Sequence, residues 1–286
     1  PGGGGVVPPP AEEIPVPLAT AAEAPPRDAN NVFVLEPEGT EFAMIGALRG
    51  IAPNEQIFAV RFLGDVGYVV TFEQVDPLFT IDLSDPTAPA VLGELHITGF
   101  STYLHPFGSA HLIGIGREGT ETGQVLGLQL QLFDVSDPTA PARTHQELLG
   151  LGDTGWSWSE AEHDHHAFTF HAARSLLAIP VTLEDWGWER DEYEHFSGVI
   201  VYHVDADAGF AEMGRVSHTG LVRDVVCSPE ERMDPGVDDA CEVYGYPWFA
   251  HMRRSVFIED VLYAFSHVGV TVSSVDALDE PLVTIP

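Results

Sequence analysis

The chain has 286 residues, of which 44% are hydrophobic, enough to bury a substantial core in one large or two ordinary domains. It carries 44 acidic residues against 12 basic ones, all of them Arg, which gives a formal charge of −32. Because nucleic-acid binding needs a basic surface that displaces counterions, this balance excludes nucleic acid as a partner. No apolar run is long enough for a membrane helix, so no membrane span is expected.

The acidity has two interpretations that the sequence leaves open. It favours cationic partners or metal ions, but a saline habitat or a GC-rich genome produces it without any ligand.

The chain begins with a segment that has little to bury. Residues 1–29 are rich in Pro, Gly, Ala and Glu, without a period, and read as a linker or tail. From residue 30 to about 50 the character changes, because two alternating apolar runs at 32–36 and 41–46 flank a Pro-Glu-Gly turn. This pair of strands lacks the two strands that should precede it.

Four units of four short strands follow, at 57–97, 98–150, 160–220 and 247–286, with residues 221–246 as an insertion. In the first unit we expect strands at 57–62, 67–72, 77–82 and 90–97. The second repeats this order at 101–106, 111–115, 127–133 and 142–149. The third has 165–170, 176–181, 198–203 and 211–216, and the fourth has 253–258, 261–265, 270–275 and 282–285.

A repeated turn marks the units. Residues 82–89 read Asp-Leu-Ser-Asp-Pro-Thr-Ala-Pro, and residues 134–141 read Asp-Val-Ser-Asp-Pro-Thr-Ala-Pro. We expect the Asp and Ser side chains to bond backbone amides two residues on, while the first Pro fixes φ. Degenerate copies lie at 205–209 and 276–281, so the corner residue recurs at Glu36, Asp82, Asp134, Asp205 and Asp276.

This period predicts an all-β fold, a β-propeller of four-stranded antiparallel blades with about four and a half blades in the chain. A sandwich is the alternative, but the four-strand repeat argues against it. Four and a half blades leave sheet edges unpaired. We therefore expect the rest of the ring to lie upstream or on another chain.

A long run of residues carries a family resemblance. It comprises VRFLGDVGYVVTFEQVDPLFTIDLSDP at 60–86, LGEL at 92–95, GFSTYLHP at 99–106 and GIG at 114–116. Together these resemble the secreted bacterial and archaeal proteins with a C-terminal β-propeller distantly related to WD repeats, and the turns resemble the LVIVD-type surface repeat. The resemblance extends over residues 31–286. It implies a secreted or cell-surface propeller, usually larger than this chain, and brings no catalytic motif.

The densest polar cluster starts the third unit, as EAEHDHHAFTFH at 160–171. On a strand, alternation places His163, His165 and His171 on one face and Asp164, His166 and Phe168 on the other. A His-x-His pair suits a transition metal, and Glu162 or a neighbouring blade would complete the site. The predicted metal ligands are therefore His163, His165, His166 and Glu162.

The alternative is that these side chains fill the central channel by hydrogen bonding. Arg61, His105 and Arg254 occupy comparable places on the first strands of the other units. We expect the two arginines to pair with acidic residues on neighbouring blades.

An insertion in the third unit, residues 184–195, places aromatic residues beside carboxylates. Its candidate binding residues are Trp186, Trp188, Asp191 and Glu192. Such a loop can form a sugar platform, a calcium site or a solvated lid, and it lacks EF-hand spacing. Trp156 and Trp158 either line the same mouth or pack between blades.

The two cysteines, Cys227 and Cys241, lie in one short polar segment without the spacing of a zinc pair. They predict a loop-closing disulfide, which suits an extracellular, cell-surface or periplasmic protein.

No nucleotide-binding glycine motif or serine-hydrolase motif occurs. Two hypotheses remain. The first is a secreted or cell-surface propeller that binds a protein partner, or the other half of its own ring, without catalysis. The second is a metal-binding propeller or metal-dependent enzyme that uses the histidine cluster.

Overall fold

The computed structural model describes residues 29–72, 76–120, 122, 124–150, 156–185, 194–218, 221 and 251–286. Strands make up most of these residues and form five antiparallel sheets. The all-β architecture of repeated four-stranded sheets that the sequence predicts is confirmed. The described part of the chain contains no helix with the length and apolar character that a membrane span requires.

The first sheet is the N-terminal hairpin, made of β1 (Asn30–Glu38) and β2 (Glu41–Ile51). Blade I contains β3 (Gln56–Leu63), β4 (Val66–Phe72), β5 (Asp76–Asp82) and β6 (Ala90–Ile97). Blade II contains β7 (Phe100–Phe107), β8 (His111–Gly119), β9 (Val125–Asp134) and β10 (Ala142–Leu149).

Blade III contains β11 (Trp156–Trp158), β12 (Thr169–His171), β13 (Leu176–Asp185), β14 (Glu194–Asp205) and β15 (Gly209–Ser217). Blade IV contains β16 (Arg254–Ile258), β17 (Val261–Ser266), β18 (Gly269–Ser274) and β19 (Ala277–Ile285).

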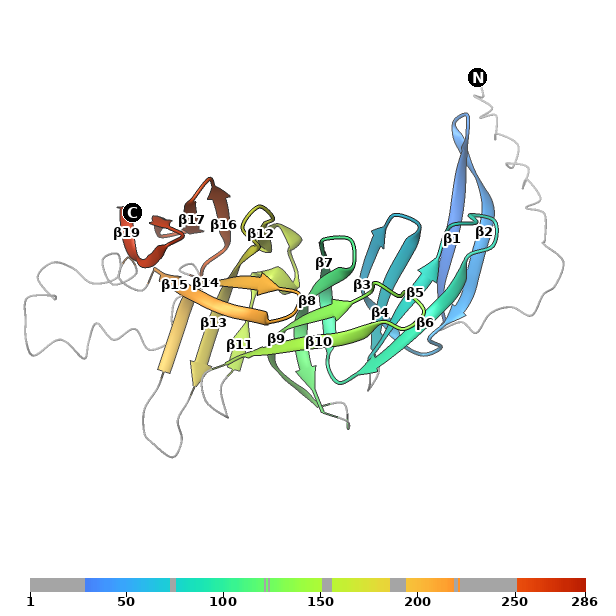
Figure 1. The fold of residues 1–286 in the computed structure, drawn as a ribbon, viewed down its shortest axis with the longest axis horizontal. Coiled ribbons are helices and arrows are strands. Elements are labelled where there is room, and N and C mark those ends of the chain that lie inside the picture. The colour runs from blue at the N-terminus through green and yellow to red at the C-terminus, as the bar shows by residue number, and fades with distance from the viewer. Residues whose placement is uncertain are drawn as a thin grey trace, which may run out of the picture.

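The sheets stand side by side along an open arc, so the ring is not closed (Figure 1). In Figure 1, the strands β3, β7 and β12 lie on the upper, concave side of the arc, and β6 and β10 lie on the lower, convex side. In blades I, II and IV, consecutive strands pair in chain order, whereas in blade III β11 and β12 both pair with β13.

The core is divided into layers between neighbouring sheets. Leu112 of β8 packs with residues of blade I, whereas Ile113 and Ile115 pack with residues of blade III. This follows from strand geometry, because successive side chains point to opposite faces. Burying each such side chain contributes about 1.5–3 kcal/mol, so every sheet between two others is stabilised on both faces.

The repeated turn has the bonds expected of its Asp side chains. The Asp82 carboxylate accepts from the Ser84 amide at 2.8 Å, and Asp134 accepts from Ser136 at 2.9 Å. Asp137 accepts from the hydroxyl of Thr139 at 2.7 Å and from its amide at 2.9 Å. These two bonds lower the pKa of the Asp137 carboxyl. The turn therefore keeps its shape through its own side chains.

The prediction of a turn at 276–281 is wrong. β19 already begins at Ala277, and Ser274 pairs with Ala277 across a tight connection. Val275 and Leu278 are both buried at 3% exposure, so their packing favours the shorter connection.

The strand expected at 165–170 is also wrong over most of its length. Two 3-10 turns, η1 (Glu160–Glu162) and η2 (His165–Ala167), occupy this part of blade III, and only β12 is extended. β11 and β12 both pair with β13, so the first strand of blade III is interrupted. The cause is local capping, because side-chain oxygens of Ser and Asp compete with sheet pairing for backbone amides.

Candidate functional site

The segment with the histidines is shaped by two caps. Ser159 Oγ accepts from the Ala161 amide at 3.1 Å, and Glu162 accepts from the Ser159 amide at 3.2 Å. This is a capping box, and the S-x-x-E sequence at 159–162 was the signal for it. Asp164 then caps the second turn by accepting from the His166 amide at 2.9 Å. Together the caps turn the histidines away from a strand geometry.

Glu162 does not lie with the histidines. Its carboxylate accepts from Arg117 of β8 through Nε at 2.6 Å and Nη2 at 2.7 Å. The Glu162 side chain is only 2% exposed, and Arg117 also donates to the Ser157 carbonyl at 2.6 Å. The predicted ligand Glu162 is therefore one half of a buried, two-pronged ion pair between blades II and III.

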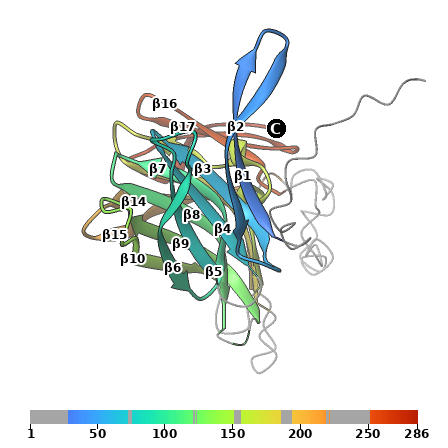
Figure 2. The same ribbon diagram turned by 90° about the vertical axis from the view of Figure 1, so that its right-hand side faces the viewer.

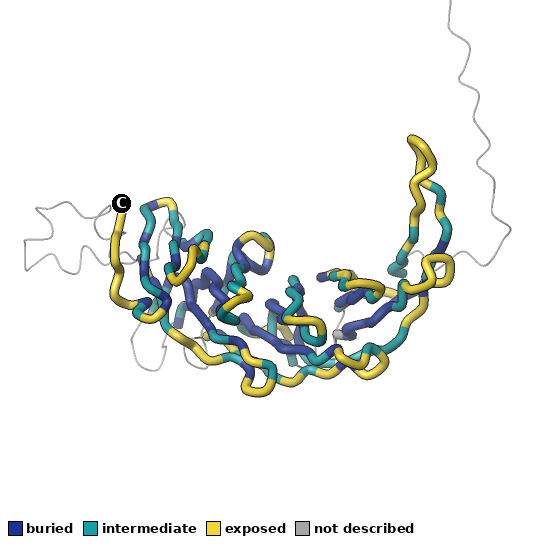
Figure 3. Tube along the Cα trace, turned by 45° about the horizontal axis from the view of Figure 1, so that its top comes forward, coloured by how far each residue is buried: buried dark blue, intermediate teal, exposed yellow. Residues whose placement is uncertain are grey.

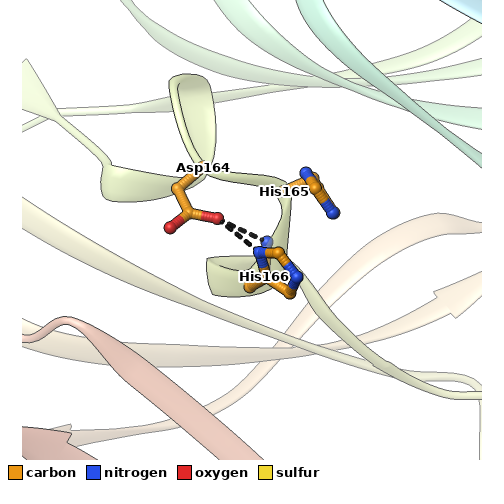
Figure 4. Close-up of side chains that lie close together, drawn as sticks. All are labelled: Asp164, His165 and His166. Carbon is orange, nitrogen blue, oxygen red and sulfur yellow. Dashed lines mark hydrogen bonds and ion pairs between the residues drawn. The ribbon is translucent and has the colours of Figure 1, made fainter.

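Asp164, His165 and His166 form the cluster that the structure does assemble. One ligand atom from each lies within 4.8 Å of the other two. Asp164 Oδ1 is 2.9 Å from His166 Nδ1, and the two imidazole rings have centroids 4.0 Å apart (Figure 4). His163 is exposed and does not join the group. Of the predicted ligands, His165 and His166 come together, and Asp164 takes the place of the carboxylate.

A cation already contacts the cluster. Arg254 of β16 donates from Nη2 to Asp164 Oδ2 at 2.6 Å. This bond, followed by the bonds from the His166 amide and ring, lowers the pKa of Asp164, which is therefore ionised at neutral pH. Arg253 adds a second link between blades III and IV, with Nη1 3.0 Å from Glu160 Oε2.

An aromatic group from β7 adjoins the histidines. The Tyr103 ring stacks on His165 with centroids 6.3 Å apart, and its hydroxyl lies 3.2 Å from His105 Nδ1. His105 also lies against Phe168 and Phe170, at 5.0 and 5.2 Å. Burial, followed by the charge of Arg61, lowers the pKa of His105 to about 4, so its imidazole is neutral at pH 7. Sequence reasoning missed Tyr103 because its neighbours come from another blade.

We define the inner-edge surface by residues from β7, η2 and its cap, and β16: Tyr103, His105, Asp164, His165, His166 and Arg254. Chemically it offers one carboxylate, three imidazoles, a phenol and a guanidinium. It is able to bind a polar peptide segment, or a transition metal through the Asp and two His groups.

The expectation for the arginines holds for Arg254, which pairs with an acidic residue of the neighbouring blade. Among the residues that the structure describes, Arg61 pairs with no carboxylate, and its buried Nε has no hydrogen-bond partner.

Several predicted residues lie outside the described residues. These are the loop residues Trp186, Trp188, Asp191 and Glu192, and the cysteines Cys227 and Cys241. Trp156 and Trp158 are described, and both lie on β11. Trp156 is 49% exposed, and the Trp158 ring lies 6.0 Å from that of His251.

Sequence comparison identifies relatives of this chain. A family model described as a Beta propeller domain matches residues 18–278. An uncharacterised protein of Archaeoglobus fulgidus is 40% identical over 153 residues, 54% of this chain and 22% of that protein. One of Methanocaldococcus jannaschii is 40% identical over 151 residues, 53% of this chain and 22% of that protein. The chain thus spans about a fifth of the length of the curated relatives it matches.

Solved structures give distant likenesses. Chaetomium thermophilum Sqt1, bound to the N-terminus of the ribosomal protein L10, has a TM-score of 0.39 and 10% identity, over 90% of this chain and 71% of that one. The Pseudomonas aeruginosa periplasmic gluconolactonase PpgL has a TM-score of 0.34 and 9% identity, over 88% and 76%. TM-scores and identities this low do not support any inference about function.

Proposed function

The chain belongs to the β-propeller domain family, and on that premise we propose that it is an exported, surface-exposed binding and assembly module without catalytic turnover. Since a propeller fold alone implies no function, the proposal depends on a site. The observation that supports it is the inner-edge surface, which blades II, III and IV build together.

The inner-edge surface is held in place by charged contacts between blades. The pair Arg117–Glu162 joins blade II to blade III, and the pairs Arg254–Asp164 and Arg253–Glu160 join blade III to blade IV. A surface that is ordered before binding loses less conformational entropy on association. Aromatic residues and Arg are also the residue types enriched at the energetic centres of interfaces. This favours a protein partner.

The chemistry of the partner follows from charge. With 44 acidic and 12 basic residues, the chain attracts basic segments over a distance and repels nucleic acid. We therefore propose a protein segment with Lys or Arg as the partner, met outside the cytoplasm. Cell fractionation and immunoblotting test the location, and recovery of the protein only in the cytoplasm would contradict it.

The binding proposal is tested by cross-linking in the cell-envelope fraction of the source organism. The baits are the wild type, the double variant His165→Ala/His166→Ala, and the control His96→Ala, whose side chain is 62% exposed on β6. We expect the same partner with the wild type and the control, and about tenfold less with the double variant, as for a hot spot. Equal recovery with all three baits would place binding elsewhere.

Metal binding is the second candidate function, and the Asp164–His165–His166 cluster favours it. A transition metal would compete with Arg254 for the carboxylate, so Arg254→Gln should strengthen Zn²⁺ binding. His166→Ala should weaken it, and His163→Ala, outside the cluster, should leave it unchanged. Calorimetry on tag-free protein measures all three. Less than about a tenth of an equivalent of metal in purified protein would contradict this candidate.

A further inference from the structure

The outer strand of every sheet contains a bulge of one residue, besides further register shifts in β2 and β19. In the N-terminal hairpin, Val34 pairs with Gly46 and Leu35 with Met44, which leaves Ile45 without an opposite residue. The same shift recurs in the last strand of each blade. The five extra residues are Ile45, Leu92, Thr144, Met213 and Leu282. The recurrence identifies β1 and β2 as the third and fourth strands of a blade, because a bulge marks a structurally equivalent position.

The next sheet packs against the residue that follows each of these extra residues. Gly46 lies against the carbonyl of Pro86, in the turn of blade I. A Cβ on Gly93 would lie 2.7 Å from the carbonyl of Pro138, in the turn of blade II. The connection between the third and fourth strands of one blade therefore lies on the outer strand of the blade before it.

Blades III and IV follow the same rule with different residues. Gly209, in the turn of blade III, lies against the ring of His145, which follows Thr144 in β10. A Cβ on Gly214 of β15 would lie 3.1 Å from Leu278, at the connection of blade IV. Four successive interfaces thus use one arrangement.

The fifth of these positions is Val283 in blade IV. Among the described residues, no further sheet packs against it. Val283 follows Leu282 in β19 and is 49% exposed, whereas the next blade contacts each of its four counterparts. The C-terminal strand is exposed over residues 279–285 (Figure 3).

The rest of this end face is apolar as well. Val256 pairs with Tyr263, Tyr263 with Val272, and Val272 with Val283, so these side chains share one face. Val256 and Ile258 of β16 are 45% and 55% exposed on it. The opposite face carries the buried Leu262, Ala264 and Thr271, which lie toward blade III. The exposed face spans β16 to β19, the full width of a blade.

We propose that this end face of blade IV is the acceptor for a further four-stranded blade of the same, longer polypeptide, with that blade's third-to-fourth-strand connection lying on Val283. The face continues an interface already repeated four times, and the matched relatives are several times longer than this chain. A separate chain is not required.

A second copy of the chain fits the face less well. The sheet it could offer is the N-terminal hairpin, whose outward face exposes Phe33, Leu35, Phe42 and Met44 and whose tip projects beyond the arc (Figure 2). A two-stranded hairpin corresponds only to the outer half of a blade and would leave Val256 and Ile258 of the inner strand in water.

The test extends the chain after Pro286 with a copy of residues 98–149, which supplies a blade with its own connecting segment. Val283→Cys and Leu282→Cys are each introduced into the original and the extended chain and labelled with maleimide. Mass spectrometry counts the adducts in excess of those on the same chain without the introduced cysteine. We expect extension to slow labelling of Val283→Cys about tenfold or more. Leu282→Cys should react at a similar rate in both chains, because Met213 at the equivalent place in blade III stays 51% exposed beside a docked blade.

Equal labelling of Val283→Cys in both chains would overturn the proposal, and so would an appended blade that a protease digests as an unfolded segment. Protection in the original chain that grows between about 1 and about 100 µM protein would show a second copy as the occupant instead. None of these outcomes depends on whether the inner-edge surface binds a partner.

Discussion

At the scale of single residues, the ion pair between Glu162 and Arg117 is the most consequential contact near the candidate site. The Glu162 side chain is 2% exposed and that of Arg117 16%, and both carboxylate oxygens accept from the guanidinium. Removing one member of such a pair leaves the other charge buried without its counter-ion. The pair therefore contributes to holding blade III against blade II.

We expect Glu162→Ala to lower the free energy of unfolding by about 3–5 kcal/mol. The control is Glu94→Ala, because Glu94 pairs with His96 at the surface, where side-chain exposures are 41% and 62%. That variant should change the free energy of unfolding by less than about 1 kcal/mol. Urea denaturation measures both variants. Equal losses of unfolding free energy would show that the buried pair contributes no more to stability than the surface pair.

The second residue-scale prediction concerns pH. Burial lowers the pKa of His105 to about 4, and burial lowers that of His218 to about 4. An unfolded histidine has a pKa near 6.5, so the unfolded state binds more protons between these two values. Stability is therefore complete above about pH 6.5 and is lost as the pH falls toward 4.

We expect His105→Gln to lose less stability than the wild type between about pH 7 and about pH 4.5, because one of the protonating groups is gone. The exposed His96→Gln should retain the wild-type pH dependence. Thermal unfolding at the two pH values measures the difference. A pH dependence in His105→Gln that matches the wild type would contradict the assignment.

At the scale of elements, the eight-residue turn does two things. Its Asp side chains shape it locally, and its Pro carbonyl lies against the outer strand of the preceding sheet. Thr80 of blade I reinforces this contact by donating to the Pro138 carbonyl. At the turns of blades I and II, contact between blades thus depends on the glycine opposite the turn, Gly46 or Gly93.

We expect Gly93→Ala to lower the free energy of unfolding by about 1–3 kcal/mol, because its Cβ would meet the backbone of Pro138 and Thr139 at 2.7–2.9 Å. Gly150→Ala is the control, because a Cβ there meets nothing within 4 Å. Calorimetry measures both variants. If the control destabilises as much as Gly93→Ala, the loss comes from glycine replacement in general.

At the scale of the whole molecule, charge and shape act against compactness. The formal charge of −32 makes the blades repel one another, and the open arc leaves apolar faces at both ends. Repulsion between like charges at the surface is screened by salt, whereas buried contacts are affected little.

We expect the melting temperature to rise when sodium chloride is raised from about 0.05 M to about 1 M, because repulsion among 44 acidic residues outweighs the few surface pairs that salt weakens. Chloride is used because sulfate also strengthens apolar burial. A melting temperature that falls with sodium chloride would mean that attractive pairs dominate.

The sequence by itself determined most of the strands, the four-strand repeat and the shape of the turn at 82–89 and 134–141. These depend on neighbours along the chain: the apolar run at 111–115 and side-chain capping by Asp82 and Asp134 are local effects. Even the interruption of blade III was present locally, in the S-x-x-E box at 159–162.

Only the tertiary structure decided which of the polar residues meet. The pairing of Glu162 with Arg117 and of Asp164 with Arg254 joins positions 45 and 90 residues apart. No periodicity encodes such contacts, because they depend on how neighbouring sheets are placed against each other. For the same reason, Val283 reads as one more strand residue in the sequence and becomes an exposed docking position only when five sheets are seen side by side.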